Sequence, residues 1–438
     1  MTGSARSPRV ALFPEASYGA ALNCVGIAQE LRRAGAEPVF ICHPGFGGIF
    51  AEYGFTEYQL AEGRPEAATD WNDFIERHKD AFAQSALDQI DSYVAPTWEA
   101  IVDTAIRAEE PLRQLIARLK PDVIVLDNVV MFPAVATAGV PWVRVVSCAE
   151  TELPDPLIPP YLSGASADDP VAWEAFAARY ERAVAPAHRR FSAFLADCGL
   201  RPGAGFLDAS PHLNLLLAPS IIRHERARTL DPRRFVFLEG CVRREAAYSV
   251  PRFASHNDAP LVLTSFGSLG AMDVGMIRRM IGVFAGMPAR FLVNAGHWRE
   301  EYSQVPDNVL VDSWFPQPSV VAQADLFIHH GGNNSFCEAL YFGVPSLVMP
   351  YCWDGHDNAT RAQEAGVGRR LDRYRWGEEE LAGAIAGLLG DRGMRDRLKA
   401  NAAFMQGAGG AARAAAEIMK LAAGPRATAR RTKPERTA

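Results

Sequence analysis

Residues 9–44 read RVALFPEASYGAALNCVGIAQELRRAGAEPVFICHP. Residues 10–13 form a short apolar run that is typical of a buried strand. Apolar residues over 25–31 then follow a helical spacing, and Gly35 can end that helix. Residues 38–42 are a second apolar run. A strand, a helix and a strand in direct succession form a βαβ unit, so the sequence predicts a parallel sheet.

The same alternation begins again after residue 260, which predicts two similar α/β halves. We expect an N-terminal domain over 1–239, a linker over 240–258, a C-terminal domain over 259–424 and a disordered tail over 425–438. Further strands are predicted at 122–126, 142–146, 213–217, 236–238, 261–268 (ending in a tight turn), 291–296, 309–314, 326–332 and 345–350. Helices are predicted within 66–120, 170–198 and 276–287.

Composition excludes several classes of protein. Of the 438 residues, 48% are hydrophobic and 22% are charged, which is typical of a globular chain and not of a disordered, collagen-like or coiled-coil chain. The net charge of −6 argues against a nucleic-acid binder. Seven dispersed cysteines without a C-x-x-C pair indicate a reducing compartment and no structural zinc. No signal-peptide pattern or long apolar run is visible, so we expect a soluble cytoplasmic protein.

The segment that carries chemistry lies within residues 311–368. Its part LFIHHGGNNSFCEAL predicts a strand, a glycine-rich turn and a helix. Gly331 and Gly332 let the backbone approach a ligand, and the free N–H groups of the helix start attract an anion. His330 can add a donor. The pattern G-x-x-x-x-G-K-S/T is absent, so the turn is not a P-loop.

Two further residues extend this anion site toward a nucleotide. Glu338 lies one turn into the helix and can accept hydrogen bonds from a ribose diol. Trp314, on the preceding loop, offers a flat face for a base. The sequence therefore predicts a nucleoside diphosphate site at the carboxyl ends of parallel strands.

The ordered set of W-x-P-Q at 314–317, H-G-G-x-N-S-x-x-E-A at 330–339 and P-x-x-x-D-x-x-x-N-A at 350–359 resembles a known family. This family comprises the UDP-dependent glycosyltransferases of small molecules, with the plant UGT signature and bacterial macrolide transferases. The resemblance is close over 312–368 and weaker over 9–45, 121–147 and 260–268. It implies the GT-B fold, in which two Rossmann-like domains face each other across a cleft and the C-terminal one holds the donor.

The resemblance also implies a role for each matching residue. The base would stack on Trp314, with the nucleoside held by Gln317 and the ribose by Glu338. Asp354 would contact sugar hydroxyls. The diphosphate would be bound by Ser268, His330, Gly331, Gly332, Asn334 and Ser335. Because a carboxylate suits both ribose hydroxyls, we expect UDP rather than dTDP.

The chain departs from the family pattern at two places. Gly355 stands where the family usually has a sugar-binding Gln, and His356 or Asp357 either replaces it or faces solvent. Ala20 stands where the family has its catalytic His, although the partner acid is present as Asp127.

The resemblance implies an inverting displacement with an oxocarbenium-like transition state. No D-x-D triplet is present, so we expect a metal-independent reaction without any cofactor beyond the UDP-sugar co-substrate. Asp127 is the favoured general base, and its alternative interpretation is a structural acid. Glu15, Tyr18 and Asn23, in the loop before the first helix or at its start, are the other candidates. Glu150 and Glu152 are candidate acceptor contacts, or belong to a solvated loop.

The sequence therefore predicts a bacterial hexosyltransferase of secondary metabolism with an atypical base. The alternative is an inactive nucleotide-sugar-binding homologue or an auxiliary partner of another transferase. We expect a nucleotide sugar and a small-molecule acceptor as partners, without nucleic acid or membrane, and leave a homodimer open. The acceptor, the sugar and the role of the tail are not readable from the residues.

Overall fold

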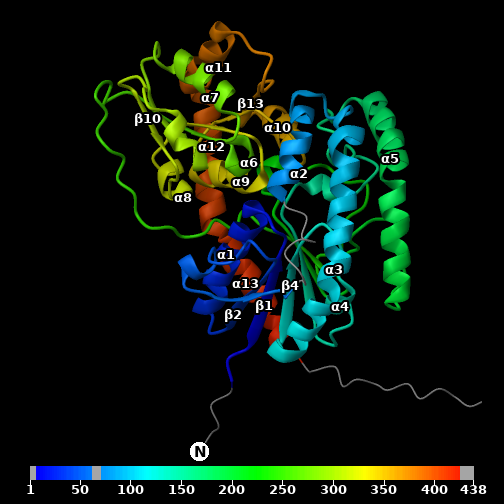
Figure 1. Ribbon diagram of the computed structural model, residues 1–438. Helices are drawn as coiled ribbons and strands as arrows, with labels where there is room; N and C mark the ends of the chain where they lie inside the picture. Colours follow the sequence, from blue (N-terminus) through cyan, green and yellow to red (C-terminus); the bar gives the residue numbers. More distant parts are fainter. Residues whose placement is uncertain (1–5, 62–70, 425–438) are drawn as a thin grey trace, which may run out of the picture.

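The computed structural model describes residues 6–61 and 71–424 of the chain (Figure 1). The predicted tail over 425–438 lies outside these residues, as do residues 66–70 of the first predicted helical segment. Two parallel sheets form the framework, so the predicted pair of α/β halves is confirmed. Within the described residues no helix is long and apolar enough to cross a bilayer.

The N-terminal sheet has seven parallel strands in the order β3-β2-β1-β4-β5-β6-β7. Its centre, where β1 pairs with β4, brings Pro14 level with Asp127, so the two strands end side by side. The strands are β1 (Arg9–Pro14), β2 (Glu37–Cys42), β3 (Thr56–Gln59), β4 (Val123–Asp127), β5 (Trp142–Val146), β6 (Leu213–Leu216) and β7 (Phe235–Phe237). The helices are α1 (Tyr18–Arg33), α2 (Trp71–His78), α3 (Ala95–Leu119), α4 (Pro133–Ala136) and α5 (Pro170–Asp197).

The C-terminal sheet has six parallel strands in the order β10-β9-β8-β11-β12-β13. Ser265 at the end of β8 is level with His329 at the end of β11. The strands are β8 (Leu261–Ser265), β9 (Arg290–Asn294), β10 (Val309–Asp312), β11 (Leu326–His329), β12 (Ser346–Val348) and β13 (Gly368–Arg370). The helices are α6 (Gly267–Gly270), α7 (Val274–Phe284), α8 (Gln317–Val321), α9 (Asn333–Phe342), α10 (Gly355–Glu364), α11 (Glu378–Gly390), α12 (Arg392–Ala408) and α13 (Gly410–Ala423).

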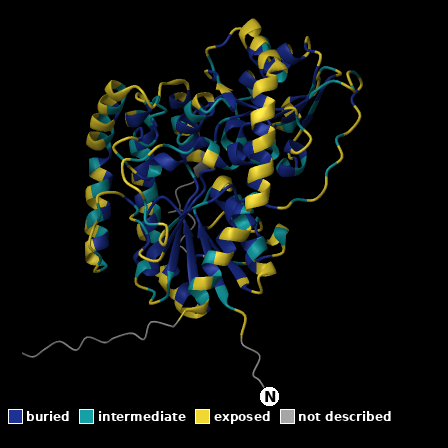
Figure 2. Cartoon of the chain, turned by 180° about the vertical axis from the view of Figure 1, so that it is seen from behind, coloured by how far each residue is buried: buried dark blue, intermediate teal, exposed yellow. Residues whose placement is uncertain are grey.

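Helices cover both faces of the N-terminal sheet, which explains why its strands read as continuous apolar runs. Alternate residues of β1 illustrate this, because Ala11 and Phe13 pack in the cluster under α3 and α5, whereas Val10 and Leu12 pack under α1. Figure 2 shows these strands buried and the outer faces of the helices exposed.

The end of the chain crosses back to the N-terminal half. Helix α13 packs against α1 and β4, and Ala414, Ala415 and Ile418 are buried in the same cluster as Val10 and Leu12 (Figure 1). We assigned all residues up to 424 to the C-terminal domain, but the packing of α13 places residues 410–423 in the N-terminal core. An alanine-rich amphipathic helix fits either half, so only tertiary contacts determine this assignment.

Candidate functional site

The glycine-rich turn lies where the sequence predicts it, between β11 and α9. Gly331 has a φ of +93°, and a Cβ there would lie 2.7 Å from the carbonyl oxygen of Gly355. Glycine is therefore required both for the backbone conformation and for the close packing of the turn against α10. The turn opens at the carboxyl edge of the C-terminal sheet, where parallel α/β folds bind their ligands.

Three side chains converge on Glu338, whose carboxylate is 1% exposed. Asn334 Nδ2 lies 2.9 Å from Oε1, and Gln317 Nε2 lies 2.7 Å from Oε2 and 3.0 Å from the hydroxyl of Ser335. The structure thus brings together four residues that the sequence assigns to the donor site. The third side chain is Arg243, whose Nη1 lies 2.6 Å from Oε1 and which we did not predict.

Arg243 comes from the linker, which we expected to be a polar connection. Its side chain is 3% exposed and pairs with both Glu338 and Glu245. The sequence shows Arg243 only as one of several basic residues of the linker, so it gives no sign that this side chain is buried. Arg243 reaches Glu338 of α9, which lies 95 positions later in the chain, only through the tertiary structure.

His330 is half-buried and its ring lies between two backbone turns. A Cβ at Gly267 would lie 3.0 Å from its Cε1, and a Cβ at Gly332 would lie 2.5 Å from its Nε2. Burial, with a smaller contribution from the Arg373 guanidinium, lowers the pKa of His330 to about 4. The ring is therefore neutral at pH 7 and can offer one N–H to an anion. Ser268 follows Gly267 on the neighbouring turn and is exposed.

Gly332→Ala is expected to displace the His330 ring and to lower turnover by about tenfold or more, because small misplacements of a reacting group are costly. Gly332 has a φ of −56°, so the added methyl group introduces no backbone strain. Gly282→Ala is the matched control, since nothing lies within 4 Å of a Cβ there. Steady-state rates of both variants check this, and an unchanged rate in Gly332→Ala would place His330 outside the reaction.

Asp354 occupies part of the helix start that we assigned to the diphosphate. Its Oδ2 accepts hydrogen bonds from the backbone N–H of Asn333 and from Asn358 Nδ2, each at 3.1 Å. Burial raises the pKa of Asp354 to about 7. Its predicted contact with sugar hydroxyls stays a prediction, and a bound anion would have to share the Asn333 N–H with this carboxylate.

The departure at Gly355 has a steric cause, because a Cβ there would lie 2.6 Å from the carbonyl oxygen of His330. His356 and Asp357 are buried, so the interpretation that they face solvent is wrong, whereas a role in place of the missing Gln stays a prediction. His356 Nε2 is 3.0 Å from Gln89 Oε1, and Asp357 accepts from Thr151 Oγ1 and two backbone N–H groups of residues 162–164. Both side chains therefore join the two halves of the molecule.

Other contacts also hold the halves together. Asn333 Nδ2 is 3.0 Å from the carbonyl oxygens of both Ser147 and Leu217. Arg361 donates to the carbonyl oxygens of Ile222 and Arg223, each at 2.7 Å. The start of α9 is thus fixed against the carboxyl ends of β5 and β6.

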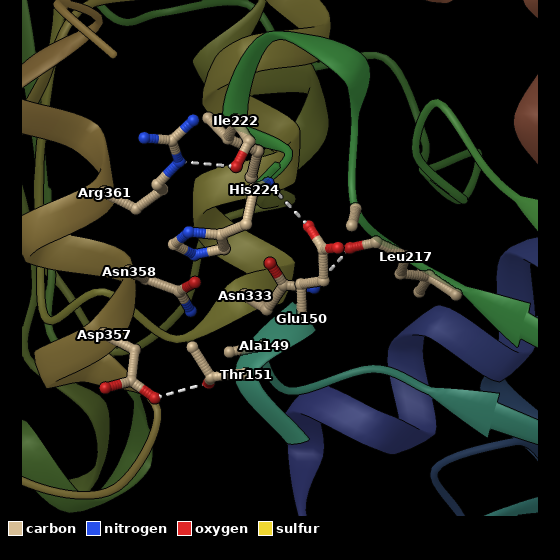
Figure 3. Close-up of a pocket in the computed structure, with 11 residues that line it drawn as sticks. Ala149, Glu150, Thr151, Leu217, Ile222, His224, Asn333, Asp357, Asn358 and Arg361 are labelled. Carbon is tan, nitrogen blue, oxygen red and sulfur yellow. Dashed lines mark hydrogen bonds between the residues drawn. The ribbon is translucent and has the colours of Figure 1, made fainter. Parts of the chain in front are cut away.

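A small pocket lies at this junction between the two halves (Figure 3). Asn333, Asn358 and Arg361 reach it from the C-terminal half, whereas Glu150 and His224 reach it from the N-terminal half. The lining of this pocket does not include Glu338 or the side chains that contact it.

The two predicted acceptor contacts are paired within the N-terminal half. Glu150 Oε1 lies 2.8 Å from Arg226 Nε, and Glu152 forms a buried ion pair with Arg144. Neither belongs to a solvated loop. Trp314, in contrast, is 58% exposed on the loop after β10, and so its face is free for stacking.

Glu15 and Asp127 meet at the ends of β1 and β4, where the backbone N–H of Glu15 donates to the carbonyl oxygen of Asp127 at 2.7 Å. The Asp127 carboxylate is 2% exposed and accepts from Ser147 Oγ at 2.6 Å and from Cys24 Sγ at 3.6 Å. Burial raises the pKa of Asp127 well above its usual range. Both of its oxygens are therefore engaged inside the protein.

Glu15 is less enclosed than Asp127. It accepts from Ser17 Oγ at 2.8 Å, and burial raises the pKa of Glu15 to about 7. The charge of Glu15 makes a small contribution to the raised pKa of Asp354, which burial dominates.

The remaining candidates in this region differ from Glu15 in exposure. Tyr18 is 51% exposed and packs its ring against Phe46. The Asn23 amide is buried, with no partner for its Nδ2 among the described residues. Ala20 is buried in the first turn of α1, so no basic side chain occupies that position.

Two facing Rossmann-like domains with a glycine-rich donor turn define the GT-B class of glycosyltransferases, and the predicted fold class is confirmed. The solved structure of the kitacinnamycin glycosyltransferase superposes with a TM-score of 0.69 at 24% identity, covering 95% of this chain and 100% of that one. Residues 283–420 match the family described as the C-terminal domain of erythromycin biosynthesis protein CIII-like proteins.

Sequence relatives agree with this match. The NDP-glycosyltransferase YjiC of Bacillus subtilis (strain 168) is 31% identical over 251 residues, which cover 55% of this chain and 62% of that protein. The oleandomycin glycosyltransferase of Streptomyces antibioticus is 29% identical over 234 residues, covering 52% and 53%. The matched segments span less than two thirds of either relative. They confirm the predicted resemblance to bacterial glycosyltransferases of small molecules.

Proposed function

We propose that this chain is an inverting, metal-independent glycosyltransferase that moves a hexose from a nucleoside diphosphate sugar to a small-molecule acceptor. The observation that carries the proposal is the convergence of Gln317, Asn334, Ser335 and Glu338 beside the glycine-rich turn. In this arrangement Glu338 accepts from the ribose, and Trp314 stacks on the base.

The leaving diphosphate is stabilised by fixed donors in our proposal. The neutral His330 ring and the backbone N–H groups at the start of α9 surround the turn, and donors that need no reorganisation stabilise developing charge well. A bound metal is not required for this step.

The acceptor proton passes to Glu15 in our proposal. With a pKa of about 7, Glu15 is suited to act as a general base near neutral pH. Asp127, which the sequence favours, has both oxygens engaged by Ser147 and Cys24 and would support Glu15 through the shared strand ends. Its own role as base stays a prediction.

The alternative of an inactive homologue is not favoured, because the relatives are named as glycosyltransferases. The preference for UDP that the sequence predicts depends on a free carboxylate at Glu338. Arg243, Asn334 and Gln317 already donate to that carboxylate, so the choice between UDP and dTDP stays a prediction.

Thermal unfolding with UDP, dTDP and a panel of nucleotide sugars tests the donor site. A ligand at 100 times its Kd stabilises the folded state by about 2.7 kcal/mol, so a bound nucleotide gives a clear shift. Trp314→Ala is expected to weaken binding by about 1–3 kcal/mol through lost stacking. Phe404→Ala, which removes another exposed aromatic side chain on α12, is the control. The absence of a shift with every nucleotide would contradict the proposal.

A further inference from the structure

The carboxylate of Asp357, in the first turn of α10, is bound by three donors of the N-terminal half. Its Oδ2 accepts from Thr151 Oγ1 at 2.6 Å and from the backbone N–H of Leu162 at 2.8 Å (Figure 3). Its Oδ1 accepts from the backbone N–H of Gly164 at 2.7 Å. All three donors belong to residues 151–164, which we call the junction loop.

The junction loop forms an anion-binding turn around this carboxylate. Leu162 has a φ of +70° and Gly164 a φ of +55°. A positive φ is costly for leucine, and such residues persist only where the surrounding structure fixes them. Turns that contain left-handed residues can direct neighbouring N–H groups toward one anion. The two N–H groups bound to Asp357 belong to these two residues, so its carboxylate fills the turn.

The same turn is also held through its carbonyl group. The carbonyl oxygen of Gly164 accepts from Thr360 Oγ1 at 2.7 Å and from Arg370 Nη1 at 3.0 Å. A Cβ at Gly164 would lie 2.8 Å from the Cβ of His356, so the loop backbone packs directly on α10. The peptide groups around Gly164 are therefore fixed by the C-terminal half on both their donor and their acceptor sides.

The junction loop carries two apolar side chains toward the proposed sugar subsite. The ring of Tyr161 lies edge-on to that of Trp353, with 6.3 Å between the ring centroids. Leu162 is buried in the cluster against which Trp353 packs. Trp353 directly precedes Asp354 and has a φ of +54°. Leu162 and Trp353 are two of the four described non-glycine residues with positive φ, so strained backbone from both halves gathers at this one cluster.

We propose that Asp357 is a positioning residue, which fixes the junction loop to α10 so that Tyr161 and Leu162 form the wall of the acceptor site beside Asp354. The inference rests on the proposed function, which places the sugar at Asp354. An acceptor has to reach the anomeric carbon from the N-terminal half, and the junction loop is the part of that half bound to α10 next to Asp354. A misplacement of about 1 Å can cost about 10²-fold in rate, so the loop has to be held firmly.

Asp357→Asn tests whether the carboxylate holds the loop. Asparagine keeps the shape of the side chain but turns one acceptor into a donor that faces an N–H group. Hydrogen exchange at the amides of Leu162 and Gly164 is expected to become about tenfold faster or more, as befits the loss of a hydrogen bond to a charged group. Asp168→Asn is the matched control, because this exposed carboxylate just beyond the loop accepts from its neighbour Ser166.

A comparison of glycosyl transfer with hydrolysis separates positioning from a merely structural loss. With UDP-glucose as donor and a panel of phenols as acceptors, Asp357→Asn is expected to lower the transfer rate by about tenfold or more. Hydrolysis of UDP-glucose by water should not change, because water needs no acceptor wall, and the affinity for UDP in calorimetry should not change either. Equal loss of transfer and hydrolysis would overturn the proposal, as would unchanged exchange at Leu162 and Gly164.

Gly164→Ala tests the same contact without changing a charge. The added methyl group would clash with His356, so it should push the loop away from α10 and lower transfer relative to hydrolysis. Gly139→Ala is the matched control, because Gly139 has a φ of +73° and nothing lies within 4 Å of a Cβ there.

The two glycine variants keep the proposal testable if Asp357→Asn does not fold. Equal ratios of transfer to hydrolysis in Gly164→Ala and Gly139→Ala would then overturn it. If no phenol is glycosylated, hydrogen exchange in the junction loop decides alone. Failure of UDP to bind to the wild-type protein would instead contradict the proposed function.

Discussion

Replacing Glu15 with glutamine is expected to lower the turnover number by about 10²–10⁴-fold, the usual contribution of a general base. Glutamine keeps the size of the side chain and removes only its basicity. Nucleotide affinity should not change, because the donor contacts lie in the other half of the molecule. Single-turnover rates together with calorimetry on the same samples measure the two effects.

The pH profile supplies an independent test of this assignment. Burial raises the pKa of Glu15 to about 7, with the neighbouring Glu152 carboxylate acting in the same direction. A base works only when it is deprotonated, so the wild-type turnover number should fall as pH drops through about 7 and level off above it. In Glu15→Gln this dependence should disappear.

Asp127→Asn is the variant that discriminates between the two acids. If Asp127 is the base, as the sequence favours, the large loss will appear in Asp127→Asn and Glu15→Gln will stay close to wild type. Glu52→Gln serves as the control for both, since it neutralises an exposed carboxylate of the same domain. Equal activity of all three variants and the wild type would exclude a carboxylate base in this region.

His330→Ala is expected to lower the turnover number by about 10²–10³-fold, the typical cost of losing one fixed donor to a developing negative charge. The ring lies at the turn where the diphosphate would leave, and the pKa of His330 is lowered to about 4, so it acts as a neutral donor. Its contribution should therefore be constant between pH 5 and pH 8.

Product inhibition by UDP and dTDP gives a second measurement for His330. Loss of a diphosphate contact should raise the inhibition constant, whereas a merely structural change should not. His256→Ala, at an exposed position of the linker, is the control. A His330→Ala variant with wild-type turnover would show that the backbone N–H groups of α9 act alone.

The sequence determined the parts of this protein that depend on local patterns. Apolar runs such as 10–13 are continuous because both faces of each sheet are covered, and that pattern is visible without a structure. The glycine-rich turn was also predictable, since Gly331 requires a positive φ and the helix start is encoded beside it. Gln317, Asn334, Ser335 and Glu338 could be assigned to one site because the stretch that contains them resembles the donor-binding segment of a known family.

Only the tertiary structure decided which distant groups meet. Arg243 lies 95 positions before Glu338 and reaches it because α1 fixes the linker, and α13 returns to the N-terminal core by packing alone. His356 and Asp357 join the two halves because of how the domains close. The physical reason is common to all of these cases: periodicity and turn chemistry act over a few residues, whereas buried charges and polar groups take whichever partner the fold brings within hydrogen-bond distance.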